Sequence, residues 1–111
     1  MAEIRIGALG DIPRGEGRVF RAGDLEVAVF RTEQNEVYAT APRCPHRGGP
    51  LADGLVGGDT VVCPLHDRVF DLKTGCGVSH DALKIATYPI RLSERGDLWL
   101  DSAAVPEPRA A

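Results

Sequence analysis

The sequence predicts an all-β domain, an antiparallel sandwich or barrel built from short strands. Thirteen glycines and eight prolines in 111 residues favour tight turns over long helices. Several segments alternate polar and apolar residues, which is typical of a strand with one buried face. No segment of about ten residues shows a helical pattern. We therefore expect roughly eight to ten short strands, as in a small sandwich or barrel.

The first half of the chain predicts four strands separated by turn residues. Between the first two lies a glycine-rich stretch, residues 10–17, and Gly23 with Asp24 forms a tight hairpin turn. In the third strand Leu25, Val27 and Val29 share one face. The four expected strands are residues 3–6, 18–21, 25–31 and 36–40.

The second half begins with an irregular stretch, residues 41–54, which holds three prolines and three glycines. Pro89 interrupts a later apolar run and predicts an edge strand or a bulge there. Residues 1–102 are expected to form one domain and residues 103–111 a disordered tail. The expected strands are residues 55–56, 60–63, 69–72, 85–93 and 98–100.

Composition excludes several classes of protein. Thirteen basic and sixteen acidic residues give a net charge of −3, and no basic stripe predicts a nucleic-acid partner. No run approaches the roughly 18 apolar residues of a membrane span, and residues 1–13 lack the apolar run of a signal peptide. Three cysteines is an odd number, which argues against a disulfide framework. We expect a soluble cytoplasmic protein.

Two short motifs carry the candidate ligands, Cys44 with His46 and Cys63 with His66. These could be unmetallated core cysteines and surface histidines, a tetrahedral zinc site, or a [2Fe–2S] centre with two cysteines on one iron and two histidines on the other. Zinc-finger signatures keep the two cysteines together and the two histidines together. Here each loop supplies one of each, which favours the two-iron centre.

The flanking residues resemble the two-box pattern of the Rieske family. The first box is Cys44-Pro45-His46-Arg47-Gly48-Gly49-Pro50-Leu51, and the second is Cys63-Pro64-Leu65-His66 followed by Phe70-Asp71. The resemblance implies one [2Fe–2S] cluster in a subdomain of about residues 41–73, inserted into a larger antiparallel β domain. It implies that Cys44 and Cys63 hold the buried iron and that His46 and His66 hold the outer iron. Leu51, Leu65 and Phe70 would shield the cluster from water.

Two departures place the chain in the soluble, ferredoxin-type branch of this family. Respiratory Rieske proteins carry an extra disulfide at the positions of Gly49 and Leu65, and hydroxyl groups at those of Arg68 and Phe70. Without those hydrogen bonds the reduced state is stabilised less. We therefore expect a potential near the low end of the roughly −150 to +300 mV Rieske range.

Within this branch the sequence is most similar to the small subunit of assimilatory NAD(P)H nitrite reductase. The resemblance lies in the first box and in the segments at residues 15–17, 27–31 and 70–75. It implies a larger partner subunit with flavin and sirohaem, and a role in nitrate assimilation. The alternative is the ferredoxin component of an aromatic-ring-hydroxylating dioxygenase, served by an oxygenase and its reductase. A zinc-binding interaction module is the alternative of a different class. We identify no independent catalytic residues.

Several other residues could matter near the cluster. Asp67 stands where the family commonly has glycine, and with Arg47 and Arg68 it would form the charged rim met by a redox partner. Cys76 matches no ligand position and is expected to be a free loop thiol. His80 is expected to be an exposed loop histidine. Trp99 could belong to the core or to a partner contact.

Overall fold

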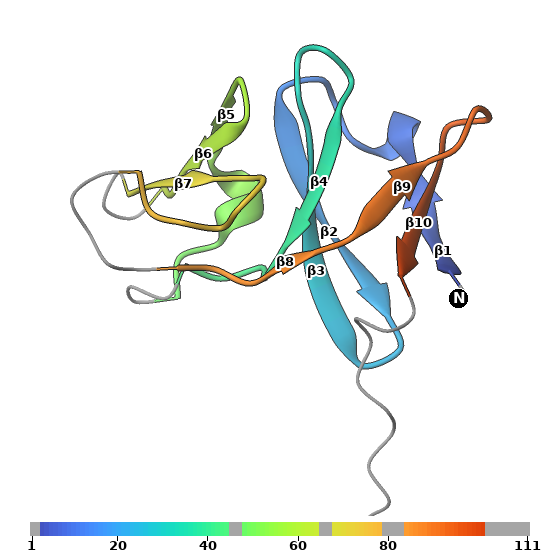
Figure 1. Ribbon diagram of the computed structural model, residues 1–111, viewed down its shortest axis with the longest axis horizontal. Coiled ribbons are helices and arrows are strands. Elements are labelled where there is room, and N and C mark those ends of the chain that lie inside the picture. Colours follow the sequence, from blue (N-terminus) through green and yellow to red (C-terminus); the bar gives the residue numbers. More distant parts are fainter. Residues whose placement is uncertain (1–2, 45–47, 65–67, 79–83, 102–111) are drawn as a thin grey trace, which may run out of the picture.

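The computed structural model describes residues 3–44, 48–64, 68–78 and 84–101, and over these residues the protein is mostly β (Figure 1). Two short 3-10 turns, η1 (Leu9–Asp11) and η2 (Leu51–Asp53), accompany the strands. No helix in these ranges is long and apolar enough to cross a membrane. The strands are β1 (Glu3–Ala8), β2 (Glu16–Ala22), β3 (Leu25–Arg31), β4 (Val37–Thr40), β5 (Leu55–Gly57), β6 (Thr60–Val62), β7 (Val69–Asp71), β8 (Thr87–Tyr88), β9 (Ile90–Leu92) and β10 (Asp97–Asp101).

The described strands form three antiparallel sheets, ordered β1-β10-β9, β2-β3-β4-β8 and β5-β6-β7. The chain leaves the second sheet after β4 and returns to it at β8, where Ala39 pairs with Tyr88. The third sheet is formed between these two points and lies apart from the other two in Figure 1. We call the first two sheets the base and the part around β5-β6-β7 the inserted lobe. This arrangement matches the expected all-β fold with an insertion, and the exact boundaries 41–73 stay a prediction.

Strand β3 is buried on both faces. Val27 and Val29 point into the core of the base, where they pack with residues of β10 such as Leu98. Ala28 and Phe30 point the other way, into a second core that belongs to the inserted lobe. The sequence pattern predicted only the first of these faces. The continuous apolar run from Val27 to Phe30 was the available signal, because strands buried on both sides lose their alternation.

One predicted strand was wrong. Residues 85–93 do not form a single element, because Pro89 separates β8 from β9 and the two strands join different sheets. Proline has no N–H to give to a ladder, while its carbonyl accepts a hydrogen bond from the Asp101 N–H at 3.2 Å. Both β8 and β9 lie at the edge of their sheets, as the proline indicated. The predicted tail lies outside the described residues.

Gly75 joins the returning chain to the inserted lobe. Its carbonyl accepts a hydrogen bond from the N–H of Ile85 at 2.8 Å, and its φ is +81°. A Cβ at this position would collide with the carbonyl oxygen of Ile85. Gly58 also has a positive φ, +60°, but no atom lies within 4 Å of the place its Cβ would take.

These two glycines provide a matched test of the close approach. Gly58→Ala should cost about 1–2 kcal/mol, the usual penalty for a side chain in the left-handed region. Gly75→Ala should cost at least about 2 kcal/mol more, because the backbone must also move apart. Urea unfolding followed by Trp99 fluorescence measures both. Equal losses of stability would show that residues 75 and 85 are not packed this closely.

Candidate metal centre

The two predicted cysteine ligands lie in the same core. Cys44 is 2% exposed and Cys63 is 1% exposed, and both belong to the apolar cluster of the inserted lobe. They come from two separate loops, one after β4 and one after β6. His46 and His66 lie outside the described residues. The structure thus brings the sulfur half of the predicted ligand set together.

The two cysteine loops are closed in the same way. The Cys44 N–H donates to the carbonyl of Gly49 at 2.8 Å, and the Cys63 N–H donates to the carbonyl of Arg68 at 2.7 Å. Each hydrogen bond joins the cysteine to the residue five positions later. In sequence, each histidine falls inside a loop closed by such a bond. The Cys–His spacings of the two boxes differ by one residue, yet the backbone closes in the same way at both cysteines.

Flanking pairs anchor both loops. The first is bracketed by a bridge between Arg43 and Pro50, and the second by the β6–β7 pair of Val62 and Val69. Within the first loop the N–H of Gly48 donates to the Cys44 carbonyl at 2.8 Å. Gly48 has a φ of +68°, which a residue without a side chain adopts readily. Gly48 thus allows a tight turn within the first box.

Among the residues that the structure describes, apolar side chains pack around the two cysteines. Leu51 and Phe70, two of the predicted shielding residues, are fully buried in the same cluster, while Leu65 lies outside the described residues. Sequence reasoning missed Phe30 from β3 and Ile85 from the returning chain, which are buried there too. These contributions come from segments distant in sequence, so the motif alone carried no signal for them.

Polar residues after the second box fix the backbone. The Asp71 carboxylate accepts hydrogen bonds from the N–H groups of Lys73, at 2.7 Å, and Thr74, at 3.2 Å. The N–H of Leu72 donates to the carbonyl of Asp59 at 2.7 Å. This local turn is the kind that aspartate favours. It directs the buried Leu72 into the core that holds the cysteines.

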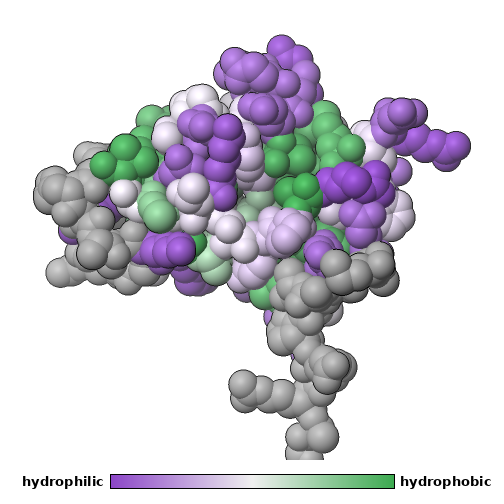
Figure 2. Space-filling model, in the orientation of Figure 1, coloured by the Kyte–Doolittle hydropathy of each residue, from purple (hydrophilic) through white to green (hydrophobic). Residues whose placement is uncertain are grey.

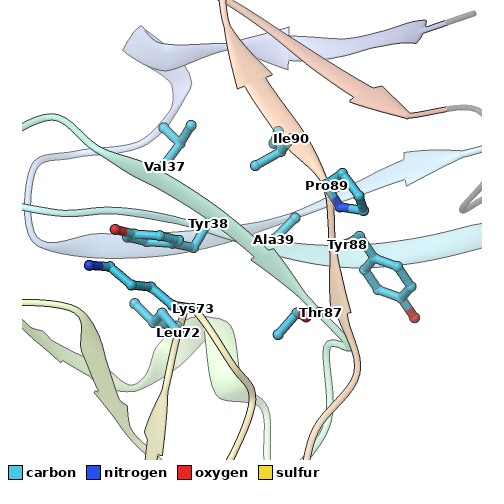
Figure 3. Close-up of a pocket in the computed structure, with 9 residues that line it drawn as sticks. All are labelled: Val37, Tyr38, Ala39, Leu72, Lys73, Thr87, Tyr88, Pro89 and Ile90. Carbon is cyan, nitrogen blue, oxygen red and sulfur yellow. The ribbon is translucent and has the colours of Figure 1, made fainter. Parts of the chain in front are cut away.

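A groove of about 410 Å³ lies where the inserted lobe meets the base, next to β4, β8 and the turn after β7 (Figure 3). In Figure 3 the Tyr38 ring and the Lys73 side chain run side by side, with the hydroxyl and the ammonium at the same end. Burial is the main cause that raises the pKa of Tyr38, and the negative charge of Glu36 is the next. The pKa of Lys73 is raised mainly by Tyr38 and next by Asp59. The nine lining residues include no cysteine, histidine or carboxylate.

The remaining predicted residues have mixed placements. Cys76 is a free, exposed thiol outside the core that holds the other two cysteines. Arg68, which was expected at the charged rim around the cluster, is partly buried. Trp99 is partly buried, with the Arg91 guanidinium 6.0 Å from its ring centroid. Arg47, Asp67 and His80 lie outside the described residues.

The chemistry of this centre fits an iron–sulfur cofactor. Thiolates are the protein ligands of [2Fe–2S] clusters, and a Rieske centre needs two of them. Two buried cysteines in one core, on separately anchored loops, supply that number of thiolates. The surrounding core also excludes water from the sulfur side.

Comparisons with known proteins agree with this site. The ferredoxin component of the naphthalene 1,2-dioxygenase/salicylate 5-hydroxylase systems of Ralstonia sp. is 34% identical over 90 residues, covering 80% of this chain and 86% of the ferredoxin. The nitrite reductase [NAD(P)H] of Emericella nidulans is 38% identical over 89 residues, which cover 72% of this chain but only 8% of that enzyme.

A solved structure shares the fold. The ferredoxin in the complex of reduced oxygenase and oxidized ferredoxin of carbazole 1,9a-dioxygenase superposes with a TM-score of 0.75 at 27% identity, covering 88% of this chain and all of that chain. The family model described as the Rieske-like [2Fe-2S] domain matches residues 4–101. This protein therefore belongs to the Rieske-like [2Fe-2S] domain family and is an electron carrier with a Rieske [2Fe–2S] cluster.

Proposed function

We propose that the chain is the electron-transfer small subunit of an NAD(P)H-dependent nitrite reductase, with its cluster held by Cys44, His46, Cys63 and His66. The observation that carries the ligand assignment is the pair of buried cysteines on equivalently closed loops. Each loop also holds one histidine in its sequence, which supplies the mixed ligand set of a Rieske centre.

The family resemblance divides the ligands between the two irons. Cys44 and Cys63, packed among Leu51 and Phe70, hold the inner iron, and His46 and His66 hold the outer one. When bound, the cluster accepts and releases one electron at a time. The chain's own contribution is to keep water from the cysteines and to hold two loops at a fixed separation. Family resemblance supports this division.

Sequence similarity supports nitrite reductase as the system served. The Emericella nidulans enzyme has the higher identity of the two relatives, 38% against 34%. The match covers 8% of that enzyme, so it concerns only one part of that protein. The resemblance implies that flavin and sirohaem belong to the larger nitrite reductase partner. Nitrate assimilation in the cytoplasm follows from this proposal.

A second candidate has its own support. The matched region makes up 86% of the Ralstonia ferredoxin, so nearly the whole of that ferredoxin corresponds to this domain. Such a domain could equally serve a ring-hydroxylating oxygenase and its reductase. The two candidates differ in which protein exchanges electrons with the cluster.

The choice of partner can be tested by reconstitution. Purified holoprotein is mixed with NADPH or NADH and either a nitrite reductase large subunit or a dioxygenase reductase, taken from the genome that encodes this chain. Bleaching of the cluster absorbance reports electron transfer. We expect faster bleaching or reoxidation with the nitrite reductase subunit. Transfer with the dioxygenase reductase alone would reject the first candidate in favour of the second.

The ligand assignment predicts the effect of single substitutions. Cys44→Ser, Cys63→Ser and His66→Ala should each abolish the EPR signal of the reduced protein and lower its iron content well below two per chain. Cys76→Ser is the matched control, since its thiol is exposed and outside the core. It should keep both the signal and the iron. A wild-type protein that is colourless and binds zinc would contradict the assignment altogether.

The missing hydroxyl groups predict a low midpoint potential. Phe70 is fully buried in the core that holds both cysteines, and its side chain has no hydrogen-bond donor. Arg68 and Phe70 stand where the respiratory Rieske proteins have hydroxyl groups. We expect a potential below zero, near the low end of about −150 to +300 mV. Spectroelectrochemical titration at pH 7 measures it. A clearly positive value would mean that other groups stabilise the reduced state.

A further inference from the structure

The two faces of the β5-β6-β7 sheet are both apolar near the second cysteine loop. Its inner face carries Val56, Val61 and Phe70, which lie opposite one another across the strands and pack into the core of the inserted lobe. An antiparallel sheet with one buried face normally presents polar side chains on the other. The outer face of this sheet does not follow that rule.

The strand register defines a continuous row on the outer face. Leu55 pairs with Val62, and Val62 pairs with Val69. The N–H of Val78 donates to the carbonyl of Val69 at 2.8 Å, which adds a fourth member. Residues directly opposite across strands point to the same face. We call Leu55, Val62, Val69 and Val78 the aliphatic row.

The aliphatic row is open to solvent. Its ends are the most exposed, with Leu55 76% and Val78 59% exposed, and its two central valines are partly buried. Figure 2 shows hydrophobic surface on the lobe that carries this sheet. The next row of the same face, which includes Thr60, Asp71 and Cys76, is polar. The apolar surface is therefore confined to the end of the sheet nearest the cysteine loop.

The row is continuous with the cluster loop. Val62 directly precedes Cys63, and Val69 directly follows Arg68, whose carbonyl closes that loop. A protein that contacts the base of this loop therefore also meets Val62 and Val69 of the row. Clusters of exposed aliphatic side chains on soluble proteins commonly mark interaction sites.

We propose that the aliphatic row is the docking surface for the redox partner, and that the partner presents an uncharged apolar patch to it. This proposal rests on the proposed electron-transfer function and specifies the chemistry of the contact. The row contains no charged side chain, so desolvation of aliphatic area, rather than ion pairing, drives the contact. Such a complex keeps most of its affinity as salt is raised, unlike one steered by charge.

Val78→Lys tests the row at one of its two exposed ends. Binding of the holoprotein to immobilised nitrite reductase large subunit, and separately to a dioxygenase reductase, is measured by surface plasmon resonance from 50 mM to 500 mM salt. The substitution should weaken binding at least about tenfold, because it places a charge in the apolar contact. Wild-type affinity should change by less than about threefold over the salt range.

Two variants serve as controls. Gln34→Lys adds the same charge in the exposed turn between β3 and β4, and Val78→Ile keeps the row aliphatic. Both should bind within about twofold of wild type, and all variants should keep the EPR signal of the reduced cluster. Rates of cluster reduction by the partner should fall in the same order as the affinities.

The outcomes separate this proposal from the function on which it rests. If wild type binds a partner and Val78→Lys binds equally well, the row is not the docking surface, and the electron-carrier function stands. If wild type binds neither partner, both the proposed function and the docking surface are rejected. If sedimentation shows a dimer that Val78→Lys converts to monomer, the row is covered by a second copy and the redox-partner proposal fails.

Discussion

The burial of β3 on both faces is the constraint on which the rest of this structure depends. Val27 and Val29 hold the strand to the core of the base, while Ala28 and Phe30 hold it to the core that contains Cys44 and Cys63. One strand thus belongs to two cores, and the position of the metal centre is fixed relative to the base sheets. A polar residue on either face would expose one core or leave an unsatisfied group in it.

The two cysteine loops are closed by the same kind of hydrogen bond. Each cysteine closes its loop by donating to a carbonyl five residues later, and each loop is anchored by a β pair or bridge. A loop that is already closed in this way needs little reorganisation when a cofactor binds. These hydrogen bonds use the N–H groups of Cys44 and Cys63 for loop closure.

An electron carrier must keep water from its cluster and yet let a partner come close. In this protein the two faces of the β5-β6-β7 sheet meet these two requirements, one face each. The inner row with Val61 and Phe70 packs against the cysteines, and the outer aliphatic row faces solvent. The groove beside Tyr38 and Lys73 lies on the joint between lobe and base, so it does not compete with the outer row for a partner.

The sequence by itself determined the all-β class, most strand positions, the family and the set of candidate ligand residues, because turn residues, alternation and metal-ligand spacing are local patterns. Only the tertiary structure decided that Pro89 divides β8 from β9 between two sheets, and that Phe30 and Ile85 enclose the cysteines. It also decided that four aliphatic residues from separate segments align beside the cluster loop. Strand register and core sharing arise from pairings between distant residues, and no local pattern records which distant residues will pair.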